Sequence, residues 1–203
     1  MKEFWDDRYN QTTYVYGEEP NLFFKENLDK LEAGRILLPA EGEGRNAVYA
    51  ARKGWQVEAF DQSAQGREKA MKLAEKYQVS FSYTIGGIDT LNYPPAFFDL
   101  IAFTYTHTPA NIRLHFHADL LPYLKSGGHV ILEGFSKAHR KHQEENPHAG
   151  GPREEDMLYS VEEIPSLFPD LETLALTEQE IILSEGIAHK GEASVIRYIG
   201  RKI

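Results

Sequence analysis

The loop AEGEG at residues 40–44 contains residue types that suit a bound nucleoside. Glycine lets the backbone pass close to a ligand, and amides at the start of a following helix bind polar groups. Asp61 ends the next predicted strand, where a carboxylate can accept hydrogen bonds from both hydroxyls of a ribose. The pattern therefore predicts a nucleoside site, against the alternative of a tight turn followed by a capping aspartate.

Two classes of nucleoside ligand fit this loop, a dinucleotide such as NAD and S-adenosylmethionine. A dinucleotide motif needs a small residue at the position that Ala47 occupies, and alanine is permitted there, so NAD stays open. Glu41 and Glu43 favour the second class, because two carboxylates suit a cationic sulfonium or amino group better than a pyrophosphate.

A second polar segment, residues 103–109, follows a strongly apolar run and falls at the carboxyl edge where open α/β sheets bind ligands. Tyr105 and His107 in this segment are the predicted catalytic residues, facing the second substrate. The alternative is a polar loop with satisfied hydroxyls. Arg153 could bind an anionic substrate and His189 lies in a terminal hairpin loop, although an isolated charge is more often solvated.

The remaining histidines do not predict a metal site. His115 and His117 are two residues apart, a spacing that directs them to different faces of a helix, so we expect surface or half-buried side chains. His139, His142 and His148 lie in an irregular stretch without supporting carboxylate or cysteine spacing.

Aromatic residues are concentrated before the first predicted strand. We expect Trp5, Tyr9 and Tyr14 to pack an N-terminal helix on the domain, with an aromatic wall around a sulfonium as the alternative. Tyr16, next to Gly17, is the aromatic residue predicted near the cofactor.

The elements around these residues alternate between strand and helix, which predicts an α/β domain with a parallel sheet. The last two strands flank a short loop and predict an antiparallel hairpin. Residues 136–153 show no period and predict a long loop, within a possible lid at 134–160. The predicted strands are 35–38, 56–60, 79–85, 98–103, 129–133, 171–183 and 193–199, and the main helices are 45–53, 64–77 and 111–124.

Composition limits the class of protein. A chain of 203 residues with 41% hydrophobic residues predicts one globular domain, 1–203, with an N-terminal helical cap at 1–33. The absence of cysteine excludes disulfides and thiolate chemistry and favours the cytoplasm. No apolar stretch approaches the length of a membrane span, so no membrane partner is expected. A net charge of -9 opposes binding to nucleic acid.

The segment LLPAEGEGRNAVYAARKGWQVEAFDQS resembles the class I S-adenosylmethionine-dependent methyltransferases, especially the tellurite-resistance and thiopurine methyltransferase-like group. FWDDRY, YVYGEEPN, FFDLIAF, LKSGGHVILEGF, GGPREEDMLYS and HKGEASVIRY extend the resemblance over nearly the whole chain. It implies a Rossmann-like methyltransferase fold, a doubly wound, mostly parallel sheet of seven strands with the last strand antiparallel. The cofactor-binding residues expected on this basis are Tyr16, Ala40, Glu41, Gly42, Gly44, Arg45, Asn46, Asp61, Gln62, Ser63, Gly87, Ile88 and Phe103.

The chain departs from the family pattern at three positions. Leu38 stands where members carry an acidic residue, and Ala40 replaces the first glycine. We hypothesise that Glu41 takes over the contact with the cofactor's amino group. Gly87 stands where many members carry an adenine-binding aspartate. The Ile88 backbone and Asp89 are therefore the candidates for contact with adenine.

These observations predict methyl transfer from S-adenosylmethionine to a small-molecule acceptor, with a thiol or chalcogen as one candidate nucleophile and S-adenosylhomocysteine as the product. The alternatives are an NAD-dependent oxidoreductase and a non-catalytic cofactor-binding protein of the same fold. The acceptor's identity and the oligomeric state do not follow from the sequence.

Overall fold

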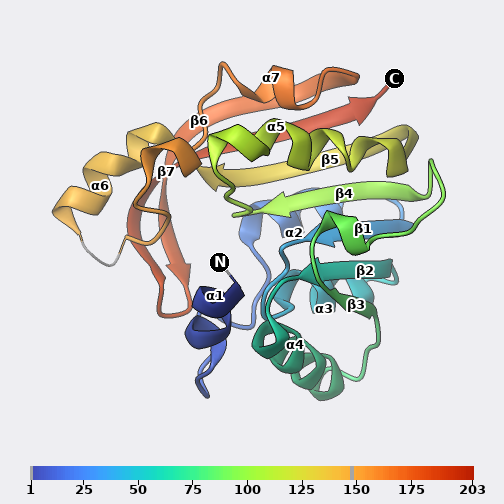
Figure 1. Cartoon of the computed structure of the whole chain (residues 1–203), viewed down its shortest axis with the longest axis horizontal. Helices are drawn as coiled ribbons and strands as arrows, with labels where there is room; N and C mark the ends of the chain where they lie inside the picture. Colours follow the sequence, from blue (N-terminus) through green and yellow to red (C-terminus); the bar gives the residue numbers. More distant parts are fainter. Residues whose placement is uncertain (1, 147–148) are drawn as a thin grey trace.

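The computed structural model describes residues 2–146 and 149–203, which form one twisted sheet with helices on both faces (Figure 1). The sheet has seven strands in the order β3-β2-β1-β4-β5-β7-β6. The strands are β1 (Arg35–Pro39), β2 (Gln56–Asp61), β3 (Ser82–Ile85), β4 (Phe98–Thr104), β5 (Leu124–Phe135), β6 (Leu171–Glu185) and β7 (His189–Lys202).

The strand directions confirm the predicted fold class. β1 pairs in parallel with β2 and β4, and the pairs β2 with β3 and β4 with β5 are also parallel. β7 is antiparallel to both of its neighbours, β5 and β6. This is the predicted doubly wound sheet with an antiparallel last strand.

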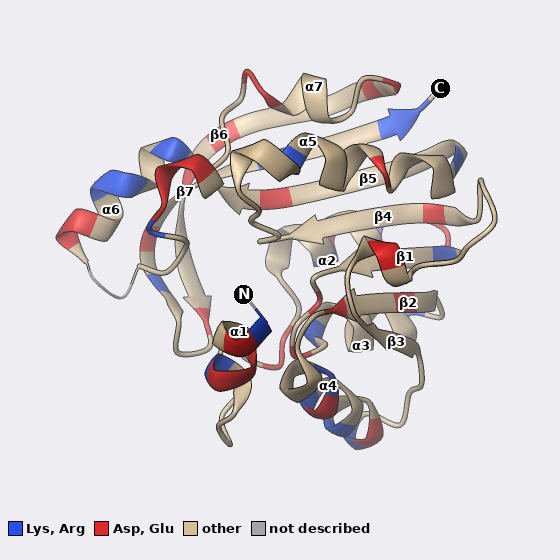
Figure 2. Ribbon diagram, viewed as in Figure 1, with Lys and Arg blue, Asp and Glu red and all other residues tan. Residues whose placement is uncertain are grey.

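The central strands are apolar because both faces of the sheet are covered. Successive side chains on a strand point to opposite faces. Leu37 accordingly joins the core under α5 and α7, whereas Ile36 and Leu38 join the core on the other face, with α2 and α3. Charged residues of both signs are found on the outer helices α4 and α6 (Figure 2).

The helices follow the strands in the expected alternation. Ser63 caps α4 by accepting a hydrogen bond from the Gly66 amide at 3.0 Å, which is the usual role of serine at that position. The α-helices are α1 (Lys2–Tyr9), α2 (Leu22–Leu28), α3 (Arg45–Arg52), α4 (Ala64–Lys76), α5 (Ala110–Ala118), α6 (Arg140–Glu145) and α7 (Ile164–Leu167). The 3-10 turns are η1 (Ile88–Thr90), η2 (Leu121–Tyr123), η3 (Lys137–His139) and η4 (Glu155–Met157).

The prediction of an irregular loop at 136–153 is wrong for part of that segment. It contains η3 and α6, and Gln143 on α6 donates hydrogen bonds to the carbonyls of Gly150 at 2.7 Å and Pro152 at 3.0 Å. A six-residue helix is too short to produce a visible period. Pro147 and His148 lie outside the described residues.

The predicted N-terminal cap contains α1 and α2. α1 packs against α4, beside the carboxyl ends of the central strands (Figure 1). Asp6 on α1 accepts hydrogen bonds from the Ser63 hydroxyl at 2.6 Å and the Gln65 amide at 3.2 Å. The N-terminal helix is therefore fixed to the helix that follows β2.

Candidate functional site

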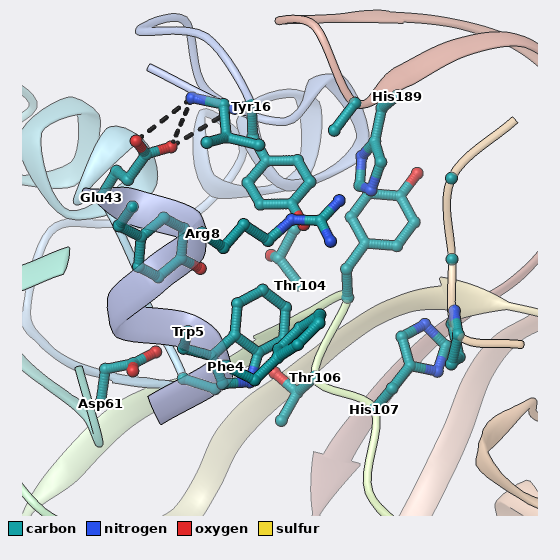
Figure 3. A pocket seen from close by; sticks show the side chains of 18 of the residues that line it. Phe4, Trp5, Arg8, Tyr16, Glu43, Asp61, Thr104, Thr106, His107 and His189 are labelled. Carbon is teal, nitrogen blue, oxygen red and sulfur yellow. Dashed lines mark hydrogen bonds between the residues drawn. The ribbon is translucent and has the colours of Figure 1, made fainter. Parts of the chain in front are cut away.

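A cavity of about 1160 Å³ lies at the carboxyl ends of β1 and β4. Its walls come from α1, the loop after β1, the segment after β4, residues 150–157 and the β6–β7 turn (Figure 3). This is the edge at which open α/β sheets bind ligands. The predicted site residues that line it are Tyr16, Ala40, Glu41, Arg45, Asn46, Asp61, Tyr105 and His107.

Two residues at the cavity floor have left-handed backbones that are unusual for side chains other than glycine. Ala40, directly after β1, has φ 52°, and Tyr105, directly after β4, has φ 51°. Such conformations cost energy and are concentrated at functional sites. Both strand ends thus bend sharply where they enter the cavity wall.

Gly42 and Gly44 do not line the cavity but permit close helix packing. A Cβ on Gly42 would lie 2.6 Å from the Tyr9 hydroxyl of α1, and one on Gly44 would lie 2.5 Å from the Ala70 Cβ of α4. Both glycines also have positive φ, at 61° and 85°. Their lack of side chains therefore brings α1 and α4 against the loop.

Asp61 is positioned to accept further hydrogen bonds from a ligand. Its Oδ2 accepts the Gly42 amide at 3.1 Å and its Oδ1 accepts the Ser63 amide at 2.8 Å. Burial raises the pKa of this carboxyl, and the backbone amides oppose the shift. A carboxylate has about four acceptor sites, so acceptor capacity remains toward the cavity that Asp61 lines.

The two glutamates of the loop have different roles. Glu43 accepts the Val15 amide at 2.8 Å and pairs with Lys69 at 2.5 Å, so it anchors the segment before α2. Glu41 accepts the Ala47 amide at 2.7 Å. Burial raises the pKa of Glu41 to about 7. A cationic ligand group in the cavity would favour the ionised form of Glu41.

A carboxylate–histidine pair lies in the β6–β7 turn. Glu185 Oε2 lies 3.0 Å from His189 Nδ1 and 3.0 Å from Arg45 Nη2. Burial pushes the pKa of Glu185 upward, but Arg45 and His189 outweigh it and lower that pKa to about 2. An ionised Glu185 accepts the Nδ1 proton, so the lone pair of neutral His189 is on Nε2.

His189 presents its ring to the cavity. It contacts the rings of Tyr16 and Tyr105, with centroid distances of 4.5 and 4.6 Å. Among the described residues, no hydrogen-bond partner is present for Nε2. Burial lowers the pKa of His189 and outweighs the opposite effect of Glu185, so the ring is neutral near pH 7. The predictions had not joined His189 to Glu185.

His107 has no free ring nitrogen in this structure. Its Nδ1 lies 2.8 Å from the Met157 carbonyl and must donate, and its Nε2 accepts the Phe135 amide at 3.1 Å. Burial lowers the pKa of His107 to about 3, which keeps the ring neutral. His107 lines the cavity, but both nitrogens are occupied by backbone groups, so it cannot accept a proton in this arrangement.

Tyr105 places a buried polar atom at the site. Its hydroxyl is buried and lies close to the Glu133 carboxylate, whose hydrogen bond helps to raise the pKa of the phenol. Burial, reinforced by the charges of Glu133 and Glu185, raises the pKa of Tyr105 well above its usual value. The phenol therefore stays protonated, and its ring packs on Phe135 at 4.7 Å.

Helix α1 supplies cavity residues, of which Phe4 and Arg8 were not singled out from the sequence. Phe4, Trp5 and Arg8 line the cavity, and the Arg8 side chain extends into it (Figure 3). Trp5 stacks on Tyr9 with ring centroids 5.5 Å apart. This arrangement fits both interpretations of Trp5 and Tyr9, the packing of α1 on the domain and an aromatic wall at the cavity.

Several predicted residues are placed away from the cavity wall. Phe103 faces the α5 side of the sheet and is 1% exposed within the core. The Ser63 hydroxyl is occupied by Asp6 and Gly66, and Gln62 is exposed. Gly87 and Ile88 lie at η1, also outside the lining.

Two further histidines can now be placed. His115 and His117 point to different faces of α5 as expected, but His117 is completely buried, so the expectation of a surface or half-buried side chain is wrong for it. Burial lowers the pKa of His117 to about 4 and keeps the ring neutral, although its Nδ1 donates to the Arg113 carbonyl at 2.7 Å. In residues 2–146 and 149–203, no cluster of three or more His, Asp or Glu residues could hold a metal ion. No described helix has the length and apolar character needed to cross a bilayer.

Comparison with known proteins gives a match to one family model over part of the chain. Residues 36–128 match the family model described as a methyltransferase domain. No curated protein matches the sequence significantly. The matched segment contains the glycine loop, Asp61 and the segment after β4.

Solved structures share the fold at low sequence identity. A structure concerned with conversion of a disulfide bond into a thioacetal group during echinomycin biosynthesis has a TM-score of 0.81 at 14% identity, covering 100% of this chain and 91% of the other. TehB from Haemophilus influenzae has a TM-score of 0.71 at 15% identity, covering 100% and 67%. An S-adenosylmethionine-dependent methyltransferase from Methanosarcina mazei has a TM-score of 0.69 at 16% identity, covering 91% and 99%.

The domain match and the shared fold support an S-adenosylmethionine-dependent methyltransferase and imply S-adenosylmethionine as the cofactor. The polar side chains that line the cavity fit S-adenosylmethionine. Asp61 offers carboxylate oxygens for ribose hydroxyls and Glu41 offers a carboxylate for a cationic group.

Proposed function

We propose that this protein transfers the methyl group of S-adenosylmethionine to a small molecule whose nucleophile is a thiol or another chalcogen. The observation that carries this proposal is the single cavity that joins Asp61 and Glu41 to the Glu185–His189 pair. Asp61 and His189 lie on opposite sides of it (Figure 3). One side suits a nucleoside cation and the other suits a group that loses a proton.

The cofactor side consists of the loop after β1 and the end of β2. We assign the ribose hydroxyls to Asp61 and the methionine amino group to Glu41. The cofactor, when bound, supplies an electrophilic methyl carbon on a sulfonium. Tyr16 and Trp5 add aromatic surface to the cavity wall.

His189 acts as the general base in this proposal. Its Nε2 accepts the proton of the acceptor's X–H group while Glu185 holds Nδ1–H and stabilises the imidazolium that forms. S-adenosylmethionine held here would supply the methyl group, with its sulfur as the leaving atom that keeps the bonding electron pair. The released proton is then on His189.

Tyr105 and His107 complete the acceptor side. The Tyr105 ring lies beside that of His189, with centroids 4.6 Å apart, and we propose that it forms part of the surface on which the acceptor packs. His107 serves as a rigid neutral wall, because the Met157 carbonyl and the Phe135 amide fix its ring. Correct placement of two reactants is the main source of rate in such a displacement.

The proposal of a chalcogen nucleophile has three supports. The structural neighbour with a TM-score of 0.81 concerns a sulfur group that changes from disulfide to thioacetal. The sequence resemblance to the tellurite-resistance and thiopurine methyltransferase-like group points in the same direction. A thiol also ionises easily enough for one histidine to suffice as base.

The absence of cysteine supports a cytoplasmic location.

Calorimetric titration with S-adenosylhomocysteine tests the cofactor assignment. We expect binding to the wild type and a loss of roughly tenfold or more for Asp61→Asn, since hydrogen bonds to a charged acceptor contribute about 1.5–3 kcal/mol. Asp170→Asn, at an exposed position before β6, is the control and should bind normally. Absence of binding to the wild type at millimolar ligand would refute the proposal.

A screen with labelled S-adenosylmethionine against thiols, selenite, tellurite and thiopurines tests the acceptor class. With an accepted thiol, His189→Gln should lower kcat about 100-fold or more, the usual contribution of a general base, while binding of S-adenosylhomocysteine stays intact. Quenching of NADH fluorescence on addition of protein would instead favour the oxidoreductase. Cofactor binding without transfer to any acceptor would favour the non-catalytic alternative.

A further inference from the structure

Arg8 brings a positive charge into the cavity from helix α1 (Figure 3). Its guanidinium carbon lies 5.6 Å from the ring centre of Phe4, 5.9 Å from that of Trp5 and 5.7 Å from that of Tyr16. Its Nε is buried and has no hydrogen-bond partner among the described residues. The Arg8 side chain also hydrogen-bonds the Tyr16 phenol, which leaves further N–H groups of its five for an anionic ligand.

Arg8 differs from other cations near the site in having no carboxylate within ion-pair distance among residues 2–146 and 149–203. A half-buried guanidinium is costly to desolvate without an anion, and it binds carboxylates with two parallel hydrogen bonds. Three neighbouring cations are already neutralised in this way: Arg45 by Glu185 at 3.0 Å, Lys69 by Glu43 at 2.5 Å and Arg197 by Glu133 at 2.5 Å.

Arg8 points toward the acceptor side of the cavity. In Figure 3 its guanidinium extends toward Tyr16 and His189, whereas Asp61 lies on the other side. Besides burial, the charges of Arg45 and Arg8 contribute to the lowered pKa of His189, which agrees with this proximity. The cation is thus close to the proposed base and removed from the residue assigned to the ribose.

We propose that the methyl acceptor carries a carboxylate or similar oxyanion and that Arg8 binds it, while the apolar part of the acceptor packs on Trp5 and Phe135. This inference rests on the proposed function and names the acceptor class more closely. The aromatic rings around Arg8 suit a planar acceptor, and the Arg8 fork suits the planar carboxylate.

The test compares 3-mercaptobenzoate with 3-mercaptobenzamide, which differ in charge but little in size. Binding is measured by calorimetry on protein saturated with S-adenosylhomocysteine, so that no turnover is needed. The variants are Arg8→Gln and Arg8→Lys, and the control is Arg52→Gln at the exposed end of α3. Thermal melting checks that each variant is folded.

We expect the acid to bind the wild type and the Arg52 control roughly tenfold or more tightly than the amide, as charge-assisted hydrogen bonds require. Arg8→Gln should reduce that ratio to near one, and Arg8→Lys should retain part of it. S-adenosylhomocysteine affinity should stay within about twofold in every variant, because Arg8 is not assigned to the cofactor.

Two results would overturn the inference while leaving the proposed function intact. The first is an acid-to-amide ratio near one in the wild type, or a ratio that Arg8→Gln leaves unchanged. The second is a large loss of S-adenosylhomocysteine affinity in Arg8→Gln with normal binding of 5′-methylthioadenosine, which lacks the amino acid part. That pattern would assign Arg8 to the cofactor's own carboxylate. Failure of the wild type to bind S-adenosylhomocysteine would instead remove the proposed function.

Discussion

The neutral state of His107 makes the stability of the fold depend on pH in a way that can be calculated. Burial lowers the pKa of this ring from 6.5 to about 3. Below pH 6.5 the unfolded chain therefore binds a proton that the folded chain does not bind. His107 thus contributes full stability above its unfolded pKa, and that contribution is lost as the pH falls from 6.5 toward 3.

The size of the effect follows from linkage. Each pH unit between the two pKa values costs about 1.4 kcal/mol, so one histidine with this shift lowers the free energy of unfolding by about 2 kcal/mol between pH 7 and pH 5. Burial also lowers the pKa of His117 and of His139 to about 4, and these groups add to the total slope. A variant of His107 isolates its own share.

The assay is urea unfolding of the wild type and His107→Gln at pH 7, 6 and 5. The variant loses the paired hydrogen bonds to Met157 and Phe135, which lowers stability at every pH. The gap between variant and wild type should shrink by about 2 kcal/mol from pH 7 to pH 5. His115→Gln, on the exposed face of α5, should follow the wild-type profile. A gap for His107→Gln that is constant with pH would show that the folded ring titrates normally, and the assignment of a buried neutral tautomer would be wrong.

Three other substitutions test how the cavity walls are held, each by urea unfolding at pH 7. Ser63→Ala removes the cap of α4 and the contact with Asp6. The free energy of unfolding should fall by about 1 kcal/mol, and proteolytic cleavage in α1 should increase. Unchanged cleavage would contradict the anchoring of α1 by Ser63. Gly42→Ala puts a side chain on a backbone with φ 61°, and this strain alone should lower the free energy of unfolding by roughly 1–2 kcal/mol. The new methyl group should also clash with the Tyr9 hydroxyl, and the double variant with Tyr9→Phe should reduce that further cost. If the two costs simply add, Tyr9 does not limit the space at Gly42. Arg113→Met removes a fully buried guanidinium that donates hydrogen bonds to several backbone carbonyls. The free energy of unfolding should fall by about 3 kcal/mol. A fall of less than about 1 kcal/mol would mean that those carbonyls find other partners.

The sheet could be predicted because its signals are local. The run FDLIAF marks β4, a strand covered on both faces, and turn residues separate it from its neighbours. The hairpin of β6 and β7 follows from two extended runs around a short loop. The predicted hairpin, however, left residues 184–192 in its loop, whereas the ladder continues to the pair formed by Glu185 and His189. Because both residues were assigned to the loop, no pairing of Glu185 with His189 was predicted. Strands extended to these positions would have placed the two side by side.

The site was predictable where its residues follow strand ends and hidden where it depends on packing. Glu41 and Asp61 line the cavity because they stand at the ends of adjacent strands, a relation that spacing reveals. Arg8 belongs to α1, whose position depends on contacts with Ser63 that no sequence period encodes. Gly42 looked like a position for ligand approach, yet its missing side chain accommodates Tyr9.

The cavity walls have a consequence for redesign. Arg8 and His189, proposed to bind and deprotonate the acceptor, come from the two ends of the chain. Glu41 and Asp61, and the acceptor-side walls Tyr105 and Phe135, belong to the central portion. Grafting the terminal segments of a distant relative onto this central portion should therefore alter which compounds are accepted without rebuilding the nucleoside half.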